Sequence, residues 1–136
     1  MFEWKRTAAL APIALSLGFL GALPGPALAD GDADIGAKIF RRCQACHTVN
    51  EGQHRVGPSL YDVVGRKAGS AEGFTRYSDA MTSSGITWTE DTLSAYLENP
   101  RQYIPGNKMA FPGLRKEEDR DNVIAFIERA SDKDDD

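Results

Sequence analysis

The sequence has little basic charge, only two cysteines and two histidines, and no long apolar run after residue 29. Its 136 residues include 16 Lys and Arg against 20 Asp and Glu, which gives a net charge of −4 at pH 7. We expect no nucleic acid partner, because neutralising phosphate groups requires an excess of basic residues. We also expect no stable membrane insertion of the chain after residue 29, since a spanning helix needs roughly 20 consecutive apolar residues. No internal repeat is found, and no run alternates polar and apolar residues as a half-buried strand does.

The first 29 residues have the form of a secretory signal peptide. Two basic residues precede an apolar stretch over residues 7–23, and the small-residue pair Ala27-x-Ala29 follows it. A retained membrane anchor is the alternative, but a proline and a glycine interrupt the apolar stretch and further prolines follow it. We expect cleavage after Ala29 and export to the periplasm. The mature chain, residues 30–136, is then a single domain with a short acidic C-terminal tail.

Three segments of the mature chain have the apolar spacing of amphipathic helices. Residues 33–43 follow Asp32, a residue type that caps helix N-termini. Residues 90–99 begin with two acidic residues and stop before Pro100, which disfavours a helical residue in front of it. Residues 117–130 start with an acidic turn and then carry apolar residues at helical spacing. The sequence therefore predicts an all-α domain with three main helices, short helices and long loops.

Both cysteines lie in one motif, Cys43-Gln44-Ala45-Cys46-His47. The Cys-x-x-Cys-His spacing is the attachment signature of c-type haem. One helical turn presents the two sulfurs to the vinyl groups at the haem edge, and the imidazole that follows is the proximal ligand of the iron. The motif therefore predicts one covalently attached haem c.

Three other uses of the two cysteines compete with haem attachment. In an oxidising compartment they could form a plain disulfide. A thioredoxin-like redox pair would need a strand followed by a helix, and this context is missing from the sequence. A structural zinc ion would need two further ligands nearby, and His54 is the only histidine outside the motif.

Met109 is the candidate for the second axial ligand of a haem iron. It lies in a loop that is bounded by Pro105 and Pro112 and separates the two C-terminal helices. Met81 lies in a polar stretch without such boundaries, and Met1 belongs to the signal peptide. A thioether ligand suits low-spin iron and stabilises the ferrous state. The alternative is that Met109 only fills a gap in the core, the usual role of an isolated methionine.

Beyond these motifs, the chain resembles the family of mitochondrial cytochrome c and bacterial cytochrome c2 over essentially the whole mature sequence. The resemblance is carried by Gly36-x-x-Ile39-Phe40, Cys43-x-x-Cys46-His47-Thr48-Val49, Gly57-Pro58-x-Leu60, Gly65-Arg66-Lys67-x-Gly69, Gly73-Phe74, Tyr77-x-Asp79-Ala80, Gly85-Ile86-Thr87-Trp88 and Tyr96-Leu97-x-Asn99-Pro100 through Lys108-Met109. It implies the small cytochrome c fold, in which helices and long loops wrap around one covalent haem c.

The resemblance implies that the haem is contacted by Cys43, Cys46, His47, Pro58, Arg66, Tyr77, Trp88, Tyr96 and Met109. The cysteines attach the haem, and the histidine and the methionine are the axial ligands of its iron. The proline carbonyl accepts a hydrogen bond from the imidazole and so orients it. The buried haem propionate is held by Arg66, Tyr77 and Trp88. Tyr96 lies on the Met109 side of the haem.

The resemblance also concerns the packing of the chain ends and shows where this chain departs from the family. Gly36 and Phe40 are implied to meet the C-terminal helix near Phe126, because a glycine lets two helices approach closely. Relative to mitochondrial members, the stretch between the motif histidine and Pro58 is one residue shorter, and Arg76 is an extra residue before the following tyrosine. The family's usual excess of lysine is missing.

An iron ligated by His and Met has no open coordination position, so the resemblance implies an electron carrier rather than an enzyme. We expect this carrier to be a monomer. The expected donor is a quinol:cytochrome c reductase, and the expected acceptor is a terminal oxidase or a photosynthetic reaction centre. The alternatives are a peroxidase-like haem enzyme and a dedicated acceptor for a periplasmic dehydrogenase. Basic residues in the segments that the resemblance places around the haem edge predict a docking ring on an acidic body: Lys38, Arg41, Arg42, Arg55, Arg101, Lys108, Arg115 and Lys116.

Overall fold

The computed structural model describes residues 31–132, which form helices connected by loops. The helices in this part of the chain are α1 (Ala33–Phe40), α2 (Asp79–Thr82), α3 (Glu90–Glu98), α4 (Pro100–Tyr103) and α5 (Glu117–Asp132). The described residues contain no strand, and their only β feature is an isolated antiparallel bridge between Lys67 and Thr87. The predicted all-α fold is confirmed, with α1, α3 and α5 as its main helices. The predicted signal peptide and residues 133–136 of the acidic tail lie outside the described residues.

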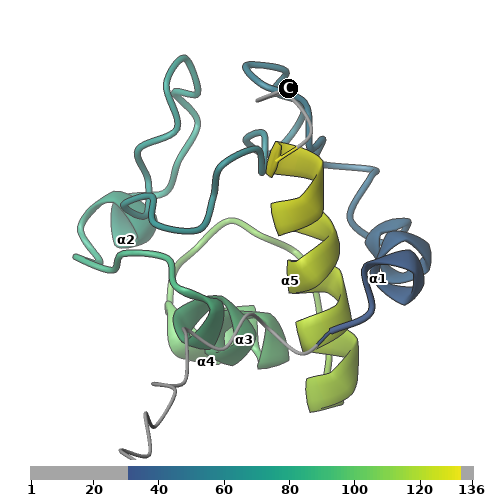
Figure 1. The fold of residues 1–136 in the computed structure, drawn as a ribbon. Helices are drawn as coiled ribbons and strands as arrows, with labels where there is room; N and C mark the ends of the chain where they lie inside the picture. The colour runs from purple at the N-terminus through teal and green to yellow at the C-terminus, as the bar shows by residue number, and fades with distance from the viewer. Residues whose placement is uncertain (1–30, 133–136) are drawn as a thin grey trace, which may run out of the picture.

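Helices α1 and α5, from the two ends of the described chain, pack side by side (Figure 1). Gly36 faces α5 so closely that a Cβ atom there would lie 1.9 Å from the backbone oxygen of Asn122. On the same helix Phe40 is 2% exposed, and its ring centroid lies 5.1 Å from that of Phe126. The contact expected between these residues is confirmed, and the missing side chain of the glycine is what permits it.

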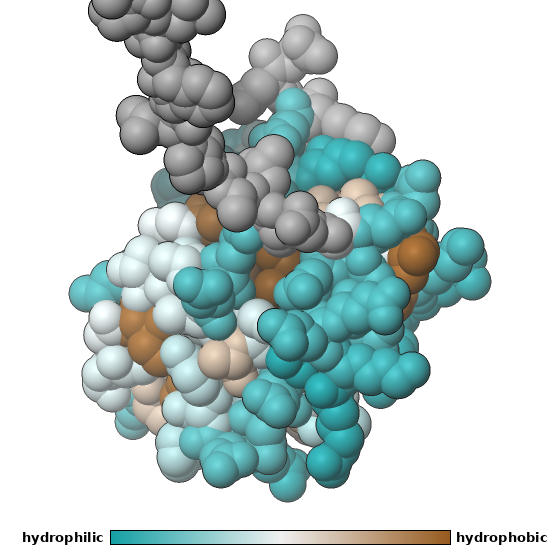
Figure 2. Space-filling model, turned by 60° about the horizontal axis from the view of Figure 1, so that its bottom comes forward, coloured by the Kyte–Doolittle hydropathy of each residue, from teal (hydrophilic) through white to brown (hydrophobic). Residues whose placement is uncertain are grey.

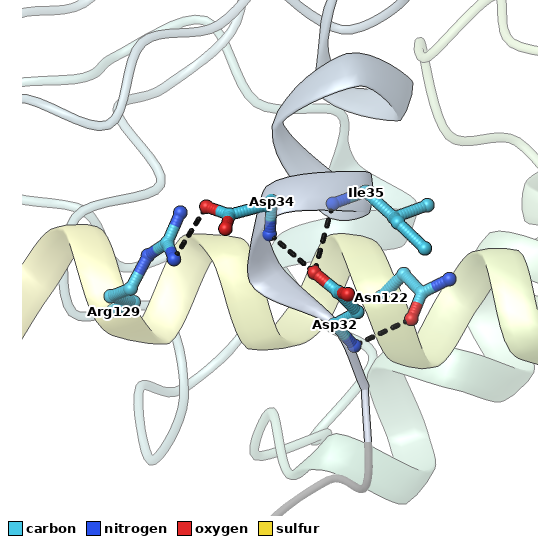
Figure 3. A network of polar contacts seen from close by, with 5 residues as sticks. All are labelled: Asp32, Asp34, Ile35, Asn122 and Arg129. Carbon is cyan, nitrogen blue, oxygen red and sulfur yellow. Dashed lines mark hydrogen bonds and ion pairs between the residues drawn. The ribbon is translucent and has the colours of Figure 1, made fainter.

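A network of polar contacts holds the start of α1 on α5 (Figure 3). The carboxylate of Asp32 accepts hydrogen bonds from the backbone N–H groups of Asp34 and Ile35 at 2.8 and 3.1 Å, as expected of a helix cap. The backbone N–H of Asp32 donates to Oδ1 of Asn122 at 2.6 Å. Arg129 lies further along α5 and forms an ion pair with Asp34 at 2.9 Å. Because the ion pair is exposed, the cap and the asparagine contact contribute more to the alignment of the two helices.

Local sequence explains where α3 and α4 begin and end. Thr89 and Thr92 form a capping box, in which each side chain binds the backbone N–H of the other residue. Helix α3 ends at Glu98, close to the predicted end. Pro100 then occupies the first turn of α4, where its missing N–H leaves no helical hydrogen bond unmade. The proline that ends one helix therefore begins the next, a short helix whose position was not predicted from the sequence.

The core lies where α1, α3 and α5 meet the long connection over residues 41–89. Its buried side chains include Phe40, Val123 and Ile124 from the helices and Trp88 from the connection. The face in Figure 2 is mostly hydrophilic, and its hydrophobic patches are small and separate. None of the helices in residues 31–132 combines the length and the apolar character that crossing a membrane requires.

Candidate haem site

The Cys-x-x-Cys-His motif follows α1 as a series of tight turns. The helix ends at Phe40, earlier than the predicted end at Cys43, and the N–H groups of Cys46 and His47 both donate to the Cys43 carbonyl at 3.0 and 2.9 Å. Cys43 is half-buried, Cys46 is exposed, and both are free thiols, so the plain disulfide is not formed. Burial raises the pKa of the Cys43 thiol, which disfavours the thiolate that a thioredoxin-like redox pair needs.

The His47 ring is half-buried and is oriented by one hydrogen bond. Its Nδ1 lies 2.7 Å from the carbonyl oxygen of Pro58, so Nδ1–H donates and Nε2 remains for binding a metal. Burial lowers the pKa of His47, the Pro58 carbonyl opposes this effect, and the positive charge of Arg66 adds to it. The neutral imidazole, which is the form that binds a metal, is therefore favoured.

Gly57 makes room for this ring. A Cβ atom at residue 57 would lie 2.4 Å from Cε1 of His47 and 2.8 and 2.9 Å from its two ring nitrogens. The backbone N–H of Gly57 donates to the Cys46 carbonyl at 2.8 Å, which holds this loop against the haem motif. The sequence presents Gly57 only as part of a family pattern. Its contact with the proposed ligand becomes visible in the structure.

Met109 is half-buried and accepts a hydrogen bond from Tyr96. The tyrosine hydroxyl lies 3.4 Å from Sδ of Met109 and 3.4 Å from Oδ1 of Asn107. Tyr96 is 5% exposed, and burial raises the pKa of Tyr96 to about 12. The phenol therefore stays protonated and can donate to the thioether sulfur. The structure brings Tyr96 and Met109 into direct contact.

Asn107 organises the loop that carries Met109, and sequence reasoning missed it. Its Oδ1 accepts from the backbone N–H of Met109 at 2.9 Å, and its Nδ2 donates to the carbonyls of Pro100 and Ile104, both at 2.7 Å. An asparagine side chain that binds the backbone two residues further on forms an Asx turn. The position of Asn107 in the sequence was therefore a usable signal for this role.

Arg66 and Trp88 lie together, and Tyr77 interacts electrostatically with Arg66. The backbone N–H of Trp88 donates to the Arg66 carbonyl at 2.9 Å. The Arg66 guanidinium donates to two backbone carbonyls of the preceding loop, both at 3.0 Å, and forms no ion pair within residues 31–132. Burial lowers the pKa of Arg66, whereas Tyr77 raises it. The Tyr77 hydroxyl accepts from the N–H of Ala71 at 3.1 Å.

These side chains fit a covalently attached haem c. The free thiols stand at the attachment spacing, the imidazole has one nitrogen available, and a buried phenol orients the thioether. The hydrogen bonds of the Arg66 guanidinium in the described part of the chain go to backbone carbonyls, and the indole N–H of Trp88 has no hydrogen-bond partner there. Both donors suit an anionic propionate. Among residues 31–132 no three His, Cys, Asp or Glu side chains are grouped to hold a metal ion, as a structural zinc site would require.

The basic side chains predicted to surround the haem edge are all exposed. The guanidinium carbon of Arg42 lies 5.3 Å from the centroid of the Phe111 ring, which connects the end of α1 with the segment after Met109. Arg55 donates to the Gln44 carbonyl, inside the haem motif, at 2.5 Å. Two members of the predicted ring therefore lie beside the segments that carry the proposed haem contacts.

Comparisons with known proteins find relatives that match most of the chain. The model of the cytochrome c family matches residues 33–131. Cytochrome c of Stellaria longipes is 52% identical over 101 residues, which cover 73% of this chain and 93% of that protein. Cytochrome c2 of Rhodoblastus acidophilus is 52% identical over 98 residues, which cover 71% of this chain and 91% of that protein. The solved structure of cytochrome cH from Methylobacterium extorquens has a TM-score of 0.67 and 44% identity, and the match covers 71% of this chain and 97% of that one.

The resemblance inferred from the sequence motifs is thus confirmed by similarity over nearly the whole length of these relatives. The all-α fold and the order of the motif, the buried aromatic residues and the methionine loop are consistent with it. The chain belongs to the cytochrome c family, whose members carry covalently bound haem c and transfer electrons.

Proposed function

We propose that the chain shuttles single electrons through one haem c that is joined to Cys43 and Cys46 and ligated by His47 and Met109. The observation that carries this proposal is that both ligand side chains are held by an oriented partner. The imidazole donates to a proline carbonyl at 2.7 Å, and the thioether accepts from a buried tyrosine at 3.4 Å. Each contact leaves one lone pair of the side chain available for a metal.

A bound haem c supplies an iron that alternates between the ferric and the ferrous state. Buried side chains of this chain would exclude water from it: Trp88 and Tyr96 are 6% and 5% exposed, and their ring centroids lie 5.0 Å apart. The hydrogen bond from Tyr96 withdraws electron density from the Met109 sulfur, so ligation by this sulfur would favour the ferrous state. Arg66, Tyr77 and the Trp88 indole supply donors for the buried propionate, and the arginine charge balances it.

Ligation of the iron by both His47 and Met109 would favour an electron carrier over a peroxidase-like haem enzyme, because such an enzyme needs an open position at the iron. In this chain Asn107 holds the backbone of Met109 at 2.9 Å and Tyr96 holds its sulfur at 3.4 Å, which supports the carrier function. A dedicated acceptor for a periplasmic dehydrogenase would use the same site. Only kinetics with defined partners separate that role from a general carrier.

Substitution of Met109 tests the ligand assignment, and Met81 is the matched control. Met109→Ala should keep the covalent haem and lose the visible absorption band of the ferric methionine–iron bond. Its reduction potential should fall on the order of 0.1 V, a fraction of the roughly 0.8 V that axial ligands control. Met81 is also half-buried, so Met81→Ala should keep both the band and the potential. An unchanged potential in the Met109→Ala protein would overturn the ligand assignment, and purified protein without haem would overturn the proposed function.

We further propose that exposed basic side chains form a docking ring for acidic sites on redox partners, such as a quinol:cytochrome c reductase and a terminal oxidase or photosynthetic reaction centre. The ring consists of Lys38, Arg41, Arg42, Arg55, Arg101, Lys108, Arg115 and Lys116. On a chain with a net charge of −4, such a ring creates a dipole that steers encounters. Electron-transfer rates with such a partner should fall as ionic strength rises, and rates that do not change with salt would rule out the ring. We further propose that the protein acts as a monomer.

Localisation in the periplasm, after cleavage behind Ala29, is proposed from the basic, apolar and small-residue regions of the first 29 residues. N-terminal sequencing of the exported protein should start at Asp30. A start at Met1 would contradict cleavage.

A further inference from the structure

Three basic side chains donate to backbone carbonyls and connect four segments of the chain in series. Arg55 donates from Nη1 to the Gln44 carbonyl at 2.5 Å. Arg76 donates from Nη2 to the Arg55 carbonyl. Nζ of Lys108 lies 3.4 Å from the carbonyl oxygens of both Arg76 and Tyr77. Arg76 is therefore the middle of the series, a donor through its guanidinium and an acceptor through its carbonyl.

The Arg76 guanidinium is oriented although the residue is exposed. Its Cζ lies 5.3 Å from the centroid of the Phe74 ring, and Phe74 is 9% exposed. The Phe74 ring is in turn fixed by edge-on contacts with Tyr77 and His54, at centroid distances of 4.8 and 5.5 Å. A cation above a fixed ring has fewer conformations to lose, so its bond to the Arg55 carbonyl forms at a lower entropy cost.

The two ends of this series support the two proposed iron ligands. Arg55 belongs to the same short loop as Pro58, whose carbonyl holds the His47 ring at 2.7 Å. Lys108 directly precedes Met109 in the sequence. Movement of Met109 away from its site would pull Lys108 from the carbonyls that it binds. Arg76 is also the extra residue relative to mitochondrial family members, so the family resemblance does not account for the link that it makes.

We propose that Arg76 is a positioning residue that ties the Met109 loop to the loop that orients His47, and that it thereby slows release of Met109 from the iron. This inference rests on the proposed ligation by His47 and Met109. Without the guanidinium, Lys108 would bind a segment that is no longer joined to the Arg55 loop. This segment could then move together with the Met109 loop, and opening of the Met109 loop would cost less free energy. Small external ligands would then reach the iron more often, although the ligands themselves are unchanged.

The test is the rate at which excess imidazole displaces Met109 from the oxidised haem protein, followed by loss of the methionine–iron absorption band. Arg76→Met removes the donor but keeps an unbranched side chain over Phe74, whereas Arg76→Lys keeps a cationic donor. Lys67→Met is the matched control, because Lys67 is exposed and lies outside the series. We expect a rate about tenfold higher in Arg76→Met, a factor that equals about 1.4 kcal/mol. The rates of Arg76→Lys and Lys67→Met should stay close to that of the unchanged protein.

Equal rates in Arg76→Met and Lys67→Met would overturn the inference, because loss of the Arg76 donor would then have no effect of its own. Equal rates in Arg76→Met and Arg76→Lys would also overturn it, since a cationic donor would make no difference. The lost contacts exist only in the folded protein, so the thermal unfolding midpoint of Arg76→Met should fall by no more than about 6–11 °C, which is what about 1.4 kcal/mol gives in a domain of this size, and a larger fall would show general destabilisation instead. If the unchanged protein itself lacks the band, the proposed function fails, whereas a normal band with unaltered kinetics contradicts only the role of Arg76.

Discussion

Replacement of Gly36 by alanine should destabilise the protein, because α1 and α5 leave no room for one methyl group. A Cβ atom at residue 36 would lie 1.9 Å from the backbone oxygen of Asn122, 2.6 Å from its backbone carbon and 2.8 Å from Cβ of Phe126. Two of these atoms belong to the backbone of α5 and cannot rotate away. To reach 3.0 Å, below which real Cβ contacts are essentially never found, the helices must part by roughly 1 Å.

The free energy of unfolding should fall by about 2 kcal/mol. Overpacking of a close-packed core typically costs about 1–3 kcal/mol. Separation of the helices adds to this, since a gap of about 0.5–1 Å forfeits roughly a quarter to a half of the dispersion energy between facing atoms. The atoms concerned include those of Phe40 and Ile124, which are 2% and 1% exposed. The better helix propensity of alanine opposes the loss by only about 1 kcal/mol.

Thermal unfolding of the oxidised haem protein measures this effect. For a domain of about 100 residues, 1 kcal/mol shifts Tm by roughly 4–8 °C, so Gly36→Ala should lower Tm by about 10–15 °C. Ala37→Gly is the control in the same helix, because it changes helix propensity by about 1 kcal/mol without creating a close contact. A Gly36→Ala protein at least as stable as the unchanged protein would refute the reasoning, since helix propensity would then outweigh the contact with α5.

Three further predictions concern two titratable side chains. Tyr96→Phe removes the hydroxyl that donates to Met109, so the reduction potential should fall on the order of 40 mV if that bond is about 1 kcal/mol stronger in the ferrous than in the ferric state. Equal potentials in a redox titration would contradict an effect of this bond on the potential. Burial also raises the pKa of Tyr96 to about 12. The stability that the protonated Tyr96 contributes is therefore complete below pH 10 and is lost as the pH rises towards 12. Tyr96→Phe should remove this part of the alkaline loss of stability. Burial raises the pKa of Glu128, and neighbouring acidic groups add a smaller effect in the same direction. The protonated Glu128 therefore contributes its full stability below the usual pKa range of a glutamate, and this contribution is lost as the pH rises through the raised pKa. Glu128→Gln should therefore raise stability at pH 7 by about 0.5 kcal/mol but not at pH 3, and equal denaturation midpoint shifts at both pH values would exclude this explanation.

The main helices and the haem motif were predictable because their signals act over a few residues. Asp32 caps α1 by binding the next N–H groups, and Pro100 stops α3 by restricting the residue before it. The Cys-x-x-Cys-His spacing is likewise local, since one turn of chain determines where its side chains lie.

Helix boundaries and short helices were harder to predict from the sequence. Helix α1 ends at Phe40 rather than at Cys43, because the chain after Phe40 forms tight turns. In these turns the N–H groups of Cys46 and His47 both donate to the Cys43 carbonyl. Helix α4 starts at the proline that was expected only to stop a helix. In both places the residue types are compatible with more than one backbone conformation, and contacts with other segments select between them.

The sequence by itself determined the helical class, the main helices and the residue types that can attach and ligate a haem. Only the tertiary structure decided which neighbours orient the proposed ligands: Tyr96 on the Met109 sulfur, Gly57 against the His47 ring, and Arg76 between the two supporting loops. The reason is physical. Helix caps and motif spacing depend on nearby residues, whereas these contacts join residues that are distant in the chain and meet only where the loops pack against one another.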